Sequence, residues 1–195
     1  IVVEPERVLL TYIVDMAEIP ALQEIQALDT NHDKRISPTE EQAYLDAQQA
    51  SLLTGLQLTL DGTPVVLTLH ERTLEFPVGQ GGLATLRMTF ELEAARRASS
   101  QPVALYYQAD TYPKRLGWRE ITISGVGVAL RDATVPTTSP SDGLHSYPSD
   151  ALQSPLDQRS ASATLLPAAS TLPPSVPTAQ STRATTPADD RLAGL

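Results

Sequence analysis

Alternation of apolar and polar residues is the feature that most limits how this chain can fold. Residues 8–14 place an apolar side chain at every second position, and residues 86–92 do the same. Similar runs follow at 56–60, 65–69, 103–107, 121–123 and 126–130. Side chains of a strand point alternately to opposite faces, so this period of two predicts strands with one buried face each. Six or seven such strands predict a mainly β chain, folded as an antiparallel, Ig-like β-sandwich.

One pair of these runs is joined by a strong turn signal. Asp61-Gly62 separates residues 56–60 from residues 65–69. The Asp-Gly dipeptide accepts the positive φ angles of a tight hairpin turn. We therefore expect these two runs to pair as a β-hairpin.

The period changes between the first strand and this hairpin, over residues 18 to about 53. Apolar residues recur at helical spacing from Ile19 to Leu28, and Pro20 is tolerated in the first turn of a helix. A second helix is predicted from residue 38 to about residue 53. We expect a helix–loop–helix inserted into the sandwich, joined by a loop of twelve residues at 29–40.

This loop matches the spacing of an EF-hand calcium loop. Such a loop places oxygen ligands at positions 1, 3 and 5, a backbone carbonyl at 7, a polar group at 9 and a bidentate carboxylate at 12. The residues at these positions are Asp29, Asn31, Asp33, Arg35 (through its carbonyl), Ser37 and Glu40. Because calcium prefers six to eight oxygen ligands, the spacing predicts one calcium ion held by these residues.

One position departs from the pattern, and part of it has a second explanation. Lys34 stands at position 6, where glycine is usual because the chain turns there with positive φ. A lysine costs about 1 kcal/mol of left-handed strain and adds a cation, which predicts weak binding. Ser37 and Glu40 also form a helix capping box, with Pro38 at the first helical position. Two interpretations stay open: a cation site with a structural role, or a turn that only resembles one.

A change in composition near residue 132 predicts the end of the folded domain. Residues 133–195 contain nine of the sixteen prolines and are rich in Ser, Thr and Ala. Such a segment buries too little apolar surface to offset its chain entropy. We expect a folded domain at 1–132 and a disordered linker at 133–195.

Charge and cysteine content exclude several kinds of function. The net charge of −9 and the lack of a basic cluster disfavour nucleic acid as a partner. The absence of cysteine excludes disulfides, thiolate zinc sites and cysteine nucleophiles. No apolar run is long enough for a membrane helix, and the start at Ile1 without Met predicts a processed chain or a fragment.

Aromatic residues suggest a second candidate site. Residues 112–120 combine Tyr, Trp and Arg, and Tyr106-Tyr107 lies nearby. These residue types are frequent in recognition surfaces, but the interpretation we prefer is that Trp118 packs at a corner of the sandwich. The three histidines are scattered, and the glycines at 79–82 lack the Lys and Ser/Thr of a phosphate loop, so there we expect a β-turn. No catalytic arrangement stands out, so we expect no enzymatic activity.

Several segments together resemble one family. Residues 15–20, 29–40, 79–87 and 112–121 occur in an order similar to the N-terminal extracytoplasmic domain of bacterial nickel/cobalt transporter-like membrane proteins, and residues 147–160 resemble that family's following segment. The resemblance implies an exported domain at the cell surface or in the periplasm. It also implies a Pro/Ser/Thr-rich tether and a membrane-embedded transport module of the same polypeptide. A His-Pro-Leu-Gly-like start and the transport helices are missing here, so no nickel ligand is implied.

Taken with this resemblance, the sequence leads to one expected function and one alternative. We expect an extracytoplasmic accessory domain of a divalent metal (nickel/cobalt) transporter-like membrane protein, with calcium as a structural cofactor. The alternative is a free-standing, calcium-stabilised cell-surface module that binds protein or glycan.

Overall fold

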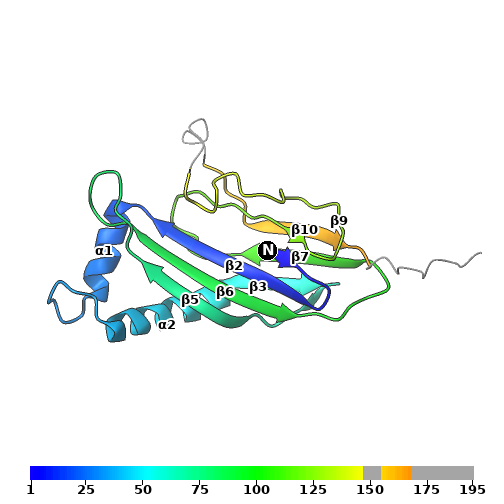
Figure 1. Cartoon of the computed structure of the whole chain (residues 1–195), viewed down its shortest axis with the longest axis horizontal. Coiled ribbons are helices and arrows are strands. Elements are labelled where there is room, and N and C mark those ends of the chain that lie inside the picture. Colours follow the sequence, from blue (N-terminus) through cyan, green and yellow to red (C-terminus); the bar gives the residue numbers. More distant parts are fainter. Residues whose placement is uncertain (147–154, 168–195) are drawn as a thin grey trace, which may run out of the picture.

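Two mainly antiparallel sheets and two helices make up the part of the chain that the computed structural model describes, residues 1–146 and 155–167 (Figure 1). The first sheet has the order β5-β6-β2-β1-β8, with β1 (Val2–Val3), β2 (Arg7–Met16), β5 (Thr68–Glu75), β6 (Leu86–Ala95) and β8 (Ser124–Gly125). The second has the order β4-β3-β7-β10-β9, with β3 (Leu56–Leu60), β4 (Thr63–Pro64), β7 (Val103–Ala109), β9 (Leu130–Arg131) and β10 (Ser160–Leu165). Neighbouring strands are antiparallel except β1 and β8, which are parallel. The prediction of a mainly β chain is confirmed.

The two sheets share one apolar core. Val8 and Leu10 of β2 lie in it beside Leu105 and Tyr107 of β7, and all four are nearly inaccessible to water. The buried residues of β2 and β7 occupy alternate positions, as the period of two predicts. This core therefore fixes the two sheets against each other.

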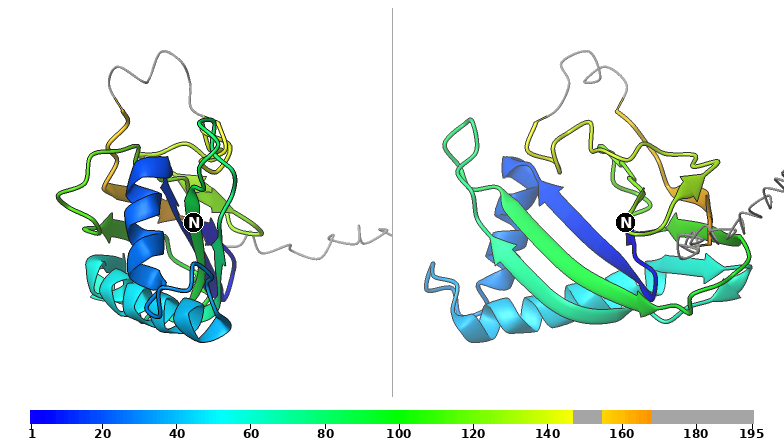
Figure 2. Two further views of the ribbon diagram at one scale, coloured as in Figure 1. Left: turned by 90° about the vertical axis from the view of Figure 1, so that its left-hand side faces the viewer. Right: turned by 45° about the vertical axis from the view of Figure 1, so that its right-hand side comes forward.

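The two helices cover the part of the first sheet that lies beyond the second sheet. β2 and β6 pair over ten residues, whereas β3 has five and β7 has seven. α1 (Glu18–Leu28) and α2 (Pro38–Gly55) bury Ala21, Leu45 and Leu52 against Met88 and Phe90 of β6. Figure 2 shows both helices on this end of the molecule. Both predicted helices are confirmed, although Ile19, part of the periodicity that predicts α1, is 65% exposed.

The hairpin prediction is confirmed only near its turn. Asp61 and Gly62 have φ angles of 48° and 75°, as a tight hairpin turn requires, and β3 pairs with β4. The returning chain then leaves the second sheet after Val65 and continues as β5 in the first sheet. The expected pairing of residues 56–60 with residues 65–69 is therefore wrong beyond Val65.

The predicted boundary at residue 132 is also wrong. β10, at residues 160–165, pairs along its whole length with β7 and also with β9. Its residues Ala161, Ala163 and Leu165 are buried in the shared core, and so is Val135. The chain at 155–167 is therefore an integral part of the second sheet and no linker. The rest of the predicted linker, 147–154 and 168–195, lies outside the described residues.

The runs predicted as strands at 121–123 and 126–130 contribute little regular structure. Ile121 and Ile123 are buried in the core, but the strands nearest to them, β8 and β9, have only two residues each. Over residues 1–146 and 155–167, neither helix is long and apolar enough to cross a membrane.

Candidate functional site

The loop predicted to hold calcium joins the two helices, at the end of the molecule away from β9 and β10 (Figure 1). α1 ends at Leu28, and the backbone N–H of the next residue, Asp29, donates to the carbonyl of Ile25. α2 begins after Ser37, whose hydroxyl accepts from the N–H of Glu40, while the Glu40 carboxylate accepts from the N–H of Ser37. The predicted capping box is confirmed. Hydrogen bonds therefore fix both ends of the loop.

The first half of the loop gathers three predicted ligands around its own backbone. The Asp29 carboxylate accepts the N–H of Asp33 at 3.1 Å and the N–H of Lys34 at 2.8 Å. The side-chain oxygen of Asn31 also accepts from the N–H of Asp33, at 2.8 Å, and the Asp33 carboxylate accepts from the N–H of Arg35 at 2.8 Å. Side chains at alternate positions thus turn inward, as the predicted spacing requires.

Lys34 adopts the backbone conformation expected at position 6 of such a loop. Its φ is 64°, in the left-handed region that favours glycine, and His32 has a φ of 59°. Both residues are exposed. The loop therefore makes the sharp turn predicted from the spacing, with a lysine where glycine would be less strained.

Glu40 is the most fully hydrogen-bonded side chain of the loop. One carboxylate oxygen accepts from the N–H and hydroxyl of Thr30, both at 2.9 Å, and from the N–H of Asn31 at 3.3 Å. The other accepts from the N–H and hydroxyl of Ser37 at 3.0 and 2.8 Å. The side chain links the beginning of the loop to the first turn of α2 and is 8% exposed.

These bonds strongly favour the ionised form of Glu40. The N–H of Ser37, then its hydroxyl, then the Thr30 hydroxyl lower the pKa of Glu40 to about 2 from its ordinary value of 4.5. A carboxylate offers about four lone-pair directions, and five donors already approach this one. To bind a cation with both oxygens, Glu40 would have to release some of these donors.

The outcome for the six predicted ligands is therefore mixed. The side chains of Asp29, Asn31 and Asp33 lie around one turn of the loop. Ser37 and Glu40 are hydrogen-bonded to each other at the end of the loop. Arg35 is exposed, and its N–H is bound to Asp33. Within the described ranges, however, no three acidic or histidine side chains are grouped closely enough to hold a metal ion. The donor set has the oxygen chemistry that calcium prefers, and the calcium site stays a prediction.

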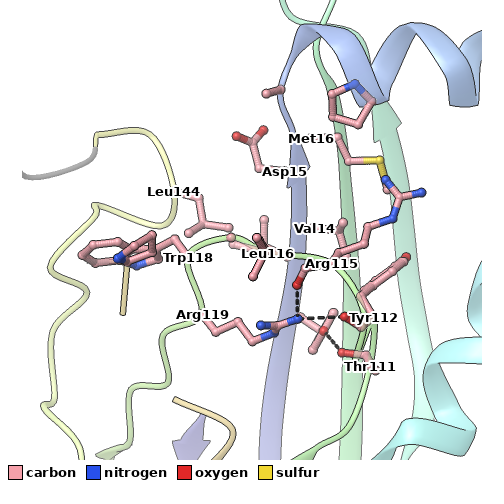
Figure 3. A pocket seen from close by; sticks show the side chains of 16 residues that line it. Val14, Asp15, Met16, Thr111, Tyr112, Arg115, Leu116, Trp118, Arg119 and Leu144 are labelled. Atoms are coloured by element: carbon pink, nitrogen blue, oxygen red, sulfur yellow. Dashed lines mark hydrogen bonds between the residues drawn. The ribbon is translucent and has the colours of Figure 1, made fainter. Parts of the chain in front are cut away.

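The second candidate site is a cavity beside the end of β2. Its far wall is the segment 111–119, drawn in Figure 3 with Leu116, Trp118 and Arg119. The cavity has a volume of about 610 Å³ and is also lined by residues 12–17. Leu116 is fully exposed, while Trp118 is half-buried and outside both apolar cores. A large cavity bordered by aromatic and apolar side chains is typical of a binding site.

Arg119 holds this wall in shape. Its guanidinium donates to the carbonyls of Tyr112 at 2.7 Å and Arg115 at 2.8 Å, and to the carboxylate of Asp157 at 3.0 Å (Figure 3 shows the first two bonds). Arg115 in turn donates to Glu24 of α1 at 2.7 Å. The wall is therefore fastened to α1 and to the chain that leads into β10.

Two partly buried tyrosines line the inner side of the same region. The Tyr112 hydroxyl donates to Gln48 of α2 at 3.0 Å, and burial raises the pKa of Tyr112 to about 12. Tyr12 shares a hydrogen bond with Thr111, and burial raises the pKa of Tyr12 as well. Both hydroxyls are thus kept protonated and act as structural links between the wall, β2 and α2.

Tyr106 and Tyr107, the aromatic pair predicted as part of a recognition surface, lie in different environments. Tyr107 is 2% exposed and belongs to the shared core, whereas Tyr106 is 40% exposed and faces outward. Glu24 and Asp157, which position the wall, were not predicted as site residues. Only the fold brings them to Arg115 and Arg119, because 91 and 38 residues separate the partners.

A comparison of this chain with models of protein families, with curated proteins and with solved structures finds no match. The likeness to nickel/cobalt transporter-like proteins therefore rests on the sequence segments alone.

Proposed function

We propose that this chain is an extracytoplasmic accessory domain of a divalent metal (nickel/cobalt) transporter-like membrane protein, built as an Ig-like β-sandwich with one structural calcium ion in an EF-hand-like loop. One observation carries the calcium part of the proposal. The Asp29 carboxylate accepts the N–H groups of both Asp33 and Lys34, while Lys34 has a φ of 64°. This is the turn that an EF-hand loop needs to wrap its oxygens around one centre.

The residues that would hold calcium are those of the loop itself. Asp29, Asn31, Asp33, Ser37 and Glu40 would supply side-chain oxygens, and Arg35 would supply its carbonyl. The bound ion would supply positive charge that offsets the repulsion among the three carboxylates. Calcium binding would also require Glu40 to exchange its bonds to Thr30 and Asn31 for the ion, and Lys34 adds a like charge. We therefore expect modest affinity.

The position of the two helices supports a structural role for the proposed ion. α1 and α2 together cover the end of the first sheet, where Met88 and Phe90 of β6 are buried. A cation that fixes the loop also fixes the angle between the helices and hence this second apolar core. The loop has no second helix–loop–helix beside it in the described part of the chain, which favours stapling over sensing.

Calorimetric titration of the full 195-residue chain with calcium tests this proposal, since β10 must be present to complete the second sheet. Wild type should release heat and gain thermal stability with added calcium. Glu40→Gln should lose both, and Glu41→Gln, its neighbour in α2, should retain both. Absence of heat and of any shift in melting temperature at millimolar calcium would refute the calcium site.

The transporter assignment has a separate test. The resemblance of residues 15–20, 79–87 and 112–121 supports it. In the complete gene, several long apolar segments should follow the codon for Leu195 in the same reading frame. A stop codon or a cell-wall anchor in their place would contradict this assignment and leave the calcium site unaffected.

The cavity beside β2 favours the second candidate, a free-standing module that binds protein or glycan. Trp118 lines this cavity and lies outside both cores. If this function is correct, Trp118→Ala should abolish a ligand interaction without lowering the melting temperature by more than a few degrees. Tyr106→Ala, on the outer face of the second sheet, is the matched control.

A further inference from the structure

Glu24 lies where three parts of the molecule meet. It belongs to α1, and one oxygen of its carboxylate accepts from the guanidinium of Arg115 in the wall at 2.7 Å. The other oxygen accepts from the hydroxyl of Tyr44 in α2 at 3.2 Å. A single carboxylate therefore joins both helices that flank the predicted calcium loop to the wall at 111–119.

The wall is also bonded directly to α2. The hydroxyl of Tyr112 donates to the side chain of Gln48 at 3.0 Å. Within the wall, the N–H of Arg115 donates to the carbonyl of Tyr112 at 3.0 Å, so both residues belong to one turn. This turn is held to α1 through Arg115 and to α2 through Tyr112. A change in the angle between the helices must therefore break one of these bonds or move the wall.

Of the two helices, α2 is fixed to the first sheet at its middle. The guanidinium of Arg72 in β5 donates to Gln49 at 2.7 Å and to Asp46 at 2.5 Å, and the Arg72 side chain is 14% exposed. Leu45 and Leu52 of the same helix are buried on either side of these bonds. Because polar and apolar contacts together hold α2, we treat it as the fixed member of the pair.

α1 is fastened by polar contacts at its first turn. The carboxylate of Glu18 accepts the N–H of Gly81, in the turn between β5 and β6, at 2.6 Å. This carboxylate packs so closely that it leaves no room for a Cβ atom at Gly79 or Gly81. Beyond the first turn, the side-chain hydrogen bonds of α1 within the described residues are the two of Glu24. A small displacement of the last turn would therefore rotate α1 about its first turn and carry Glu24 with it.

The loop at 29–40 acts on this last turn of α1. Glu40 of α2 holds Thr30 and Asn31, which follow α1 almost directly. To bind a cation, Glu40 must release these groups, while Asp29 becomes a ligand of the ion. Glu24 lies five residues before Asp29, about 7.5 Å along the helix axis. The exchange of bonds at Glu40 therefore takes place within two helical turns of the contact with the wall.

We propose that cation binding in the loop sets the position of the wall, with α1 as the connecting element and Glu24 as the positioning residue. The inference rests on the proposed calcium site and concerns the regulation that this site exerts. The two states are the loop with Glu40 bonded to Thr30 and Asn31, and the loop with Glu40 bound to the ion. By linkage, a ligand that binds against the wall changes calcium affinity by the same factor as calcium changes the affinity of that ligand.

The single tryptophan of the chain reports on the wall. Trp118 lies three residues after Arg115, and its indole N–H donates to Glu120 at 2.8 Å (Figure 3 shows both side chains of the wall). The indole N–H of Trp118 gives one signal in the NMR spectrum of the full chain. Calcium should shift this signal, and the shift should saturate at the same calcium concentration as the heat of binding.

Variants of the wall test the route through Glu24. Arg115→Ala removes the contact with Glu24 but keeps the backbone carbonyl that Arg119 binds, so the calcium-dependent shift should fall about threefold or more. Because this ion pair is half-exposed, calcium affinity itself should change by less than about threefold. Lys114→Ala, which removes the neighbouring cation, is the matched control and should keep both shift and affinity. Tyr112→Phe, which releases only the fixed helix, should keep most of the shift.

Glu40→Gln perturbs the loop in the absence of calcium. A neutral side chain cannot accept all five hydrogen bonds of Glu40, so the end of α1 should move in calcium-free buffer as well. The Trp118 signal should therefore differ between Glu40→Gln and wild type. This difference should be about threefold smaller when both proteins also carry Arg115→Ala. Glu41→Gln should give the same Trp118 signal as wild type.

The outcomes separate this inference from the calcium site. Heat of binding in wild type with an unchanged Trp118 signal would overturn the coupling and leave the calcium site intact. Equal calcium-dependent shifts in wild type and Arg115→Ala would overturn the role of Glu24. Absence of heat at millimolar calcium would refute the calcium site. The calcium-free comparison of Glu40→Gln with wild type then decides whether loop and wall are coupled, and identical Trp118 signals would overturn that coupling too.

Discussion

The loop at 29–40 and the wall at 111–119 are built in opposite ways. Every hydrogen bond that shapes the loop joins residues at most ten positions apart, as between Thr30 and Glu40. The wall depends on Arg115 and Arg119, whose carboxylate partners, Glu24 and Asp157, come from α1 and from the approach to β10. A local site can form from its own sequence, whereas a non-local one exists only when the whole fold is in place.

The largest expected effect concerns the non-local region. Ala163→Asp places a carboxylate at a position that is 4% exposed, between β7 and β9. Burying an unpaired charge should cost about 3 kcal/mol or more and abolish cooperative unfolding near room temperature. Chemical denaturation followed by Trp118 fluorescence measures this change. Ser160→Asp, on the same strand but exposed, should cost less than about 0.5 kcal/mol; equal losses would show that β10 is not part of the core.

The next effect tests the wall itself. Arg119→Gln removes charged hydrogen bonds to Tyr112, Arg115 and Asp157, and should lower the free energy of unfolding by about 2 kcal/mol. The Trp118 fluorescence of the folded protein should also change, because the segment that carries it loses its anchor. Arg131→Gln breaks only an exposed ion pair with Asp132 and should cost less than about 0.5 kcal/mol.

Low pH should act on the loop. Ionised Glu40 stabilises the fold, since its pKa is about 2 in the folded chain and 4.5 ordinarily. Its contribution is complete above pH 4.5 and should disappear as the pH falls toward 2. Urea denaturation at several pH values should show a steeper loss of stability for wild type than for Glu40→Gln. Identical pH dependence of the two proteins would show that the Glu40 bonds contribute nothing.

The smallest effect concerns one backbone angle. Lys34→Gly relieves the left-handed strain at position 6 but adds freedom to the unfolded chain, for a net gain of about 0.5 kcal/mol. Arg35→Gly relieves no left-handed strain, so this variant should lose about 0.5–1 kcal/mol of folding stability. Urea denaturation at neutral pH measures both, and a loss of stability in Lys34→Gly would mean that the strain is negligible.

The sequence predicted those parts of the fold in which pattern and contact are local. The long strands, both helices and the capping box of Ser37 and Glu40 follow from periodicity and from side chains a few residues apart. The positive φ of Lys34 also followed from its position in the loop.

The parts that were missed depend on distant partners. β10 has the sequence Ser-Ala-Ser-Ala-Thr-Leu, and this alternation is a strand signal. Its side chains are small and its surroundings are rich in Pro, so the composition of the segment predicted disorder instead. Small side chains suit this strand because β7 and β9 flank it and the core lies directly beneath it. The crossing of the chain after Val65 depends on which strands become neighbours. No single segment encodes that choice.

The most direct test of the central claim is the response of individual loop amides to calcium, followed by NMR on the full chain. Calcium should shift the amide signals of Thr30 and Asn31 strongly, because Glu40 must leave them to bind the ion. The bond from the N–H of Lys34 to Asp29 should persist, so this amide should stay protected from hydrogen exchange. Unchanged signals for Thr30, Asn31 and Lys34 at millimolar calcium would contradict the account of this loop as a structural calcium site.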